Sequence, residues 1–94
     1  MAKEYPKGMV SATGQVKRPG VVGIKERLTL SGTIAQSGGL TRIARSRNNV
    51  KLERTDSDGK TIVRAFTLKK IVEGLAEDPE LMNGDRVDVP EIVD

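Results

Sequence analysis

The sequence predicts a single small α+β domain whose elements follow the order ββαββαβ. Three observations predict it: two hairpins with their own turn residues, two short amphipathic helical segments, and a final alternating strand. Ninety-four residues supply one compact core, because two smaller cores would each bury too little surface. With one Tyr, one Phe and no Trp, that core has to be built from Val, Ile and Leu, which suit a mixed sheet of about five strands.

The first hairpin is predicted over residues 9–25. Small or apolar side chains alternate with others from Met9 to Val16, which is the period-two pattern of a strand with one buried face. Lys17-Arg18-Pro19-Gly20 then turns the chain, because Pro presets φ and Gly tolerates the positive φ that follows. The returning strand contains Val21, Val22 and Ile24.

A short main helix is expected next. Thr29 is its predicted N-cap, since the hydroxyl can accept a hydrogen bond from a free N–H group of the first turn. Leu30 and Ile34 then fall on one apolar face. Gly38-Gly39 ends the helix where left-handed backbone is needed, and Leu40 is placed to fold back onto the apolar face, as in a Schellman cap.

The second hairpin is predicted to turn at Asp56-Ser57-Asp58-Gly59, where Asp-Gly precedes the β-branched run 61–66. A second short helix follows, with Thr67 as its expected cap and Gly74 near its end. The apolar stripe of this helix, at i, i+3, i+4 and i+7, consists of Leu68, Ile71, Val72 and Leu75.

A last strand is predicted over residues 86–89, because apolar and charged side chains alternate there, and Pro90 ends it. The chain therefore divides into a flexible segment 1–8, a domain 9–90 and a flexible end 91–94. The first residues lack the apolar region of a signal peptide, so a parent protein is expected to supply any export signal.

Composition excludes most catalytic chemistry. The chain has no Cys and no His, which removes disulfides, thiolate metal sites, a Cys nucleophile and the usual general base. Gly84-Asp85 offers one carboxylate beside a turn, and a lone Asp there is expected to accept backbone N–H bonds. No apolar run is long enough to span a membrane. We therefore expect no enzymatic activity, no cofactor, no metal site and no membrane span.

Charge is distributed unevenly along the chain. The formal net charge is +3, yet residues 73–94 contain eight acidic residues against Arg86 alone. Five cations fall within fourteen residues at Arg42, Arg45, Arg47, Lys51 and Arg54. Such a segment can be a solvated face, a contact for an acidic protein or glycan, or a nucleic-acid site. Nucleic acid is the least favoured of the three, since stacking aromatics and helix-turn-helix patterns are missing from the sequence.

Three blocks of residues occur in a fixed order. They are Gly14-x-Val16-x-Arg18-Pro19-Gly20-Val21, then Leu28-Thr29-Leu30 with Ile34-Ala35-x-x-Gly38-Gly39-Leu40, then Leu81-x-x-Gly84-Asp85-x-Val87-x-Val89-Pro90. Together they resemble the SLBB, or soluble-ligand-binding β-grasp, domain of bacterial polysaccharide export proteins of the outer membrane. The resemblance covers about residues 9–90 and implies a β-grasp fold, in which a mixed sheet wraps around the first helix.

The resemblance also implies a function. Such domains are non-enzymatic modules of a periplasmic conduit for capsular or exopolysaccharide, and they are held at the outer membrane through a parent protein. The implied partners are copies of the chain or adjacent domains, the polysaccharide, and an inner-membrane chain-length regulator. The alternative is a ligand- or nucleic-acid-binding β-grasp module, such as a domain of a DNA-uptake receptor.

The residues predicted to contact a partner or a polyanionic glycan are Lys17, Arg18, Arg42, Arg45 and Arg47. One hypothesis joins them to the charge asymmetry. In a head-to-tail assembly, the acidic segment 73–94 of one copy would lie near the arginines of the next.

Overall fold

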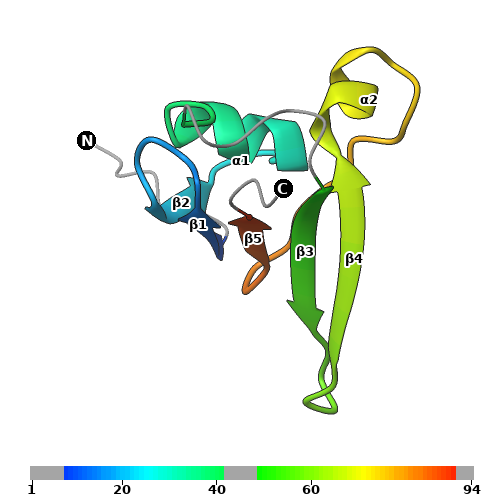
Figure 1. Cartoon of the computed structure of the whole chain (residues 1–94). Coiled ribbons are helices and arrows are strands. Elements are labelled where there is room, and N and C mark those ends of the chain that lie inside the picture. Colours follow the sequence, from blue (N-terminus) through cyan, green and yellow to red (C-terminus); the bar gives the residue numbers. More distant parts are fainter. Residues whose placement is uncertain (1–7, 42–48, 91–94) are drawn as a thin grey trace.

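The computed structural model describes residues 8–41 and 49–90, and the predicted order of elements is confirmed within them (Figure 1). The first half contains β1 (Gly8–Gly14), β2 (Gly20–Ile24) and α1 (Leu30–Gln36). The second half contains β3 (Asn49–Thr55), β4 (Thr61–Thr67), α2 (Leu68–Val72) and β5 (Arg86–Val89). The fold is therefore the predicted α+β arrangement with one mixed five-stranded sheet.

The sheet has the strand order β2-β1-β5-β3-β4. Strand β5 lies in the middle, parallel to β1 and antiparallel to β3, and so joins the two hairpins into one sheet. Each hairpin is antiparallel within itself. The parallel pair at the centre brings residues near the start of the chain against residues near its end.

Helix α1 begins and ends with the predicted caps. The Thr29 hydroxyl accepts a hydrogen bond from the Gly32 N–H at 3.2 Å. At the other end, the Gly38 N–H donates to the Ala35 carbonyl at 3.1 Å and the Gly39 N–H to the Ile34 carbonyl at 2.9 Å. Both glycines have positive φ, at 86° and 87°, which completes a Schellman motif. Leu40 packs against the core, as expected.

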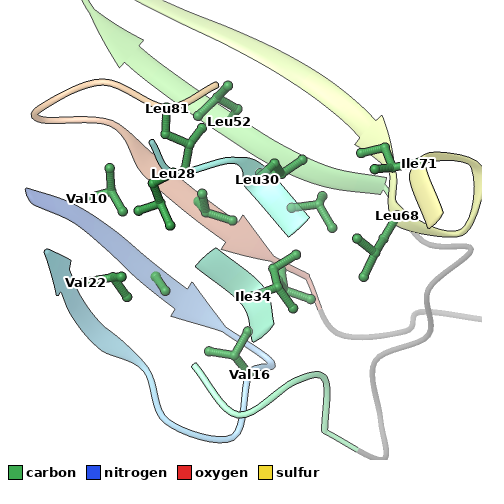
Figure 2. Packing of buried hydrophobic residues seen from close by; sticks show 14 of the residues in the cluster. Val10, Val16, Val22, Leu28, Leu30, Ile34, Leu52, Leu68, Ile71 and Leu81 are labelled. Carbon is green, nitrogen blue, oxygen red and sulfur yellow. The ribbon is translucent and has the colours of Figure 1, made fainter. Parts of the chain in front are cut away.

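The core is aliphatic and draws on four of the five strands, β1, β2, β3 and β5, and on both helices (Figure 2). Leu30 and Ile34 of α1 lie in it together with Leu68 and Ile71 of α2. The partly buried Phe66 packs against its margin. The buried cluster contains Val10, Ala12, Val16, Val22, Ile24, Leu28, Leu30, Ile34, Val50, Leu52, Leu68, Ile71, Leu81, Val87 and Val89.

Helix α2 ends near Gly74 as predicted, but its apolar stripe differs from the prediction. It is only five residues long, because Gly74, with φ of 77°, ends it in a second Schellman pattern. Leu75 therefore cannot continue the apolar stripe, and both Val72 and Leu75 are exposed. Thr67 occupies the N-cap position, but its side chain does not cap the first turn. The prediction of a four-residue stripe is wrong.

The second hairpin extends beyond the rest of the sheet (Figure 1). β3 and β4 pair over seven residues, whereas β3 and β5 pair over three. The predicted turn is confirmed: the Asp56 carboxylate accepts hydrogen bonds from the backbone N–H groups of Asp58 and Lys60, at 2.9 and 3.0 Å. Residues 61–65 of β4 are consequently exposed on both faces of the strand.

Candidate binding groove

A groove of about 400 Å³ lies between the second hairpin and the segment that precedes β5. Its size is at the lower end of the range for small-molecule sites. Apolar and charged side chains alternate around it. The lining residues are Leu52, Arg54, Ile62, Arg64, Glu77, Pro79 and Glu80.

The register of the hairpin puts four of these residues on one face. Leu52 is paired with Arg64 and Arg54 with Ile62, and directly paired residues point to the same side of a sheet. The groove face of the hairpin is the same face that buries Val50 and Leu52 nearer the core. The groove is therefore the exposed continuation of the core side of the sheet.

Arg54 is fixed in place by Asp85, whose side chain is only 1% exposed. The guanidinium donates from Nε to Oδ1 at 3.0 Å and from Nη2 to Oδ2 at 2.7 Å, which is a bidentate pair. Oδ2 also accepts the Met82 N–H at 2.8 Å, and Arg54 Nη2 donates to the Glu80 carbonyl at 3.2 Å. The hydrogen bond to Asp85 raises the pKa of Arg54 above its usual value, so the side chain stays charged.

Part of this arrangement follows from the sequence. The expectation that Asp85 accepts a backbone N–H bond is confirmed at Met82. The sequence alone does not indicate Arg54 as its partner, because the two residues lie 31 positions apart. The register between β3 and β5 would reveal the partner. Glu53 is paired with Arg86, and continuing that antiparallel register by one residue brings Arg54 to Asp85.

Several other acidic residues of the segment 73–94 also have partners in the domain. The Asp78 carboxylate accepts hydrogen bonds from the backbone N–H and the hydroxyl of Ser31, at the start of α1. Glu80 pairs with Arg27 at 2.7 Å, and Asp88 accepts from the Thr13 hydroxyl at 2.9 Å. Much of the acidic segment therefore stabilises its own domain, which leaves fewer carboxylates for the hypothetical head-to-tail contact.

Two further charged side chains line the groove, Arg64 and Glu77. Arg64 lies over the ring of Phe66, with its guanidinium carbon 5.0 Å from the ring centroid. Glu77 is exposed and makes no ion pair with any of the residues that the structure describes. These two side chains are the charged groups most open to a ligand or a partner.

The predicted contact residues do not gather at this groove. Lys17 and Arg18 are exposed, and their backbone N–H groups donate to the carbonyls of Gly39 and Ser37, just after α1. The groove lies near the other end of that helix, where the Leu30 N–H donates to the carbonyl of Pro79. Three further predicted residues lie outside the described part of the chain, namely Arg42, Arg45 and Arg47.

Gly14, the first residue of the first block, has a structural role. Its φ is 84°, and a Cβ atom there would lie 2.1 Å from the Val89 carbonyl oxygen of β5. The neighbouring Gln15 N–H donates to that same oxygen at 2.8 Å. Glycine is required because β1 and β5 approach closely at this point.

A comparison with protein families identifies the fold. The model of the SLBB domain matches residues 9–65, which is more than half of the chain. The chain belongs to the SLBB domain family. The matched range contains the Gly14 and Gly38-Gly39 blocks, and the remaining part of this SLBB domain adds α2 and the central strand β5. No curated protein matches the chain.

The SLBB family is a family of binding domains, and the groove agrees with that role. Over the described ranges 8–41 and 49–90, no cluster of three acidic side chains could hold a metal ion. Within those same ranges, no helix is long and apolar enough to cross a membrane. The groove of this SLBB domain combines apolar side chains with charges of both signs, which suits non-covalent contact with a ligand or a partner.

Proposed function

We propose that this SLBB domain is a non-enzymatic module of a bacterial capsular or exopolysaccharide export protein. It acts in the periplasm or at the outer membrane, where it contacts the polymer and neighbouring parts of the export apparatus. The observation that carries the proposal is the family match over residues 9–65, together with the third block of the resemblance at residues 81–90.

The surface chemistry supports a loosely binding module. None of the residues that line the groove is aromatic, so it has no platform on which a sugar ring could stack tightly. A conduit through which a polymer slides benefits from weak contacts. Exposed charges of both signs provide such contacts, because each exposed ion pair contributes only about 0–1 kcal/mol.

We assign the binding of a polyanionic glycan to the predicted basic residues. Lys17 and Arg18 are exposed beside the end of α1, and Arg42, Arg45 and Arg47 follow α1 in the sequence. Arginine side chains suit carboxylate groups such as those of uronic acids, because the guanidinium can donate two parallel hydrogen bonds. The proposed protein partners of the domain are copies of the chain, adjacent domains or an inner-membrane chain-length regulator.

A titration followed by backbone amide NMR shifts tests the glycan assignment. The probes are a uronic-acid oligosaccharide and a neutral oligosaccharide of the same length, each at low and high salt. We expect the acidic sugar to shift amides at residues 17–18 and 42–47, with weaker binding at high salt. Replacing Lys17 and Arg18 by Ala should reduce these shifts, whereas replacing Lys69 and Lys70 by Ala should not. Equal binding of both sugars would contradict the assignment.

The second candidate function is nucleic-acid binding, as in a DNA-uptake receptor. It is favoured by the five cations between Arg42 and Arg54. The same titration with short single-stranded DNA separates the two functions, because contacts to phosphate weaken steeply with salt. If DNA binds much more tightly than the uronic-acid oligosaccharide, the export proposal is replaced by this one.

A further inference from the structure

Among residues 8–41 and 49–90, β3 is the only strand that pairs with β4, so strand pairing occupies one of the two edges of β4. β4 is an end strand of the sheet, and its seven residues pair with β3 in a continuous register without a bulge. It contains no Pro and no Lys, the residues that commonly protect such edges. Ile62 and Val63 are both about half exposed, on opposite faces of the strand. An apolar edge of this kind is a surface onto which another strand can add.

We propose that this edge pairs antiparallel with β4 of a second copy of the chain. The charges at the two ends of the strand select this occupant and this direction. The turn before β4 carries Asp56 and Asp58, followed by Lys60, and the helix after β4 carries Lys70 and Lys69, of which Lys69 pairs with Glu73 at 3.8 Å. Antiparallel pairing of two identical strands places the acidic turn of each copy beside the lysines of the other, twice in one dimer. Parallel pairing would place like charges together.

The register follows from the symmetry of the pair. A two-fold axis between antiparallel strands requires one residue to lie opposite itself. If Arg64 were that residue, two guanidinium groups would face each other, which is destabilising. With Val63 on the axis, two valines face each other and Arg64 lies opposite Ile62 of the second copy. Asp56 then comes level with Lys70.

This register also suits the groove. Ile62 lines the groove, so Arg64 of the second copy would lie on the face that carries Glu77. Glu77 is exposed and has no ion pair among the residues that the structure describes. The dimer thus brings a cation to an open carboxylate. The inference uses only the strand edge and its charges, so it stands or falls separately from the export function.

Sedimentation of the chain over a concentration series tests the dimer. We expect a reversible dimer that weakens a few-fold when salt is raised, because the end contacts are exposed ion pairs. Val63→Lys should weaken it about tenfold or more, since two lysines would face each other on the axis. Val21→Lys is the matched control, because Val21 is 66% exposed on β2 at the opposite edge of the sheet. A strictly monomeric chain, or a dimer unaffected by Val63→Lys, would overturn the proposal.

Cysteine trapping tests the register independently of any loss of stability. The natural chain has no Cys, so a single introduced thiol reports one contact. Directly opposed residues in an antiparallel pair have Cβ atoms about 4.5–5.5 Å apart, within a small adjustment of disulfide geometry. Under mild oxidation, Val63→Cys should form a covalent dimer much faster than Ile62→Cys or Val21→Cys. If either of those two forms it as fast as Val63→Cys, the proposed pairing is wrong.

Discussion

The two hairpins are built from similar strand patterns but contribute differently to the domain. In the first hairpin, Val10 of β1 and Val22 of β2 pair directly and are both buried in the core. In the second, Leu52 of β3 is buried, but its partner on β4 is the exposed Arg64. Both strands of the first hairpin therefore contribute to the core, whereas the second hairpin has one strand in the core and one largely at the surface.

This difference teaches that a strand pattern predicts pairing better than it predicts burial. A β-branched run forms a strand wherever a neighbour supplies hydrogen bonds, but its face is buried only where another element covers it. Helix α1 and the segment before β5 cover the sheet near its centre, and β4 lies at its edge. The exposed strand is consequently one part of the fold that is available for contacts.

The largest difference between the hairpins is expected for their glycines. Gly14→Ala should destabilise the domain by roughly 3 kcal/mol or more, because the new Cβ would lie 2.1 Å from the Val89 oxygen and φ is 84°. Gly59→Ala in the second turn also has a positive φ, but nothing lies within 4 Å, so about 1 kcal/mol is expected. Urea unfolding followed by circular dichroism measures both. Equal losses would show that β1 and β5 separate easily.

Arg54 and Asp85 test how firmly the second hairpin is attached. Arg54→Met should cost about 3 kcal/mol, because it leaves the buried Asp85 carboxylate without its cation. Asp85→Asn should cost less, about 1–2 kcal/mol, since the partly exposed arginine can turn to water. Thermal and urea unfolding of both variants and the double variant give the coupling. A larger loss for Asp85→Asn would contradict this order.

The Arg54–Asp85 pair also predicts how the free energy of unfolding depends on pH through the titration of Arg54. The pKa of Arg54 is raised in the folded protein above its ordinary value, because the side chain hydrogen-bonds to the Asp85 carboxylate. A base with a raised pKa stabilises the fold below its unfolded pKa, and that contribution is lost only as the pH rises through the folded pKa. We therefore expect no loss from this group between neutral and moderately alkaline pH. A decline that Arg54→Met abolishes would contradict the assignment.

A smaller effect separates the valines of the two hairpins. Val10→Ala should cost about 2 kcal/mol, because Val10 is buried in the core and its loss leaves a cavity. Val63→Ala should change the stability of the isolated domain by no more than about 0.5 kcal/mol, because Val63 is half exposed. Unfolding at low protein concentration keeps any self-association out of the measurement. Similar costs at both positions would mean that β4 is covered in solution.

The features predicted from the sequence depend on residues close together in the chain. The caps of α1 and the turn at Asp56 were predicted because their hydrogen bonds join residues within a few positions of one another. The close approach at Gly14 and the Arg54 pair were not predicted. Both depend on the place of β5 between the hairpins, which no local pattern specifies.

The candidate site shows the same limit. The groove is formed by two neighbouring strands together with a segment that returns from much later in the chain, so charge counts along the sequence could not locate it. The count of acidic residues in the segment 73–94 also overstated how many of them are available for contacts with another molecule. Asp78 and Asp85, for example, are bound within the domain, to Ser31 and Arg54. Lys17 and Arg18, by contrast, are exposed as a contact role requires.

The smallest expected effect concerns Arg27, which follows β2 and pairs with Glu80. Its contact is as short as that of Arg54 with Asp85, at 2.7 Å in both cases, so distance alone predicts equal contributions. Both members of the Arg27 pair are well exposed, however, whereas Asp85 is buried. Water already solvates the exposed charges, and Arg27→Met should therefore cost no more than about 0.5 kcal/mol, a loss that salt should reduce further. Unfolding of Arg27→Met and Arg54→Met side by side decides whether burial or distance sets the strength of these pairs.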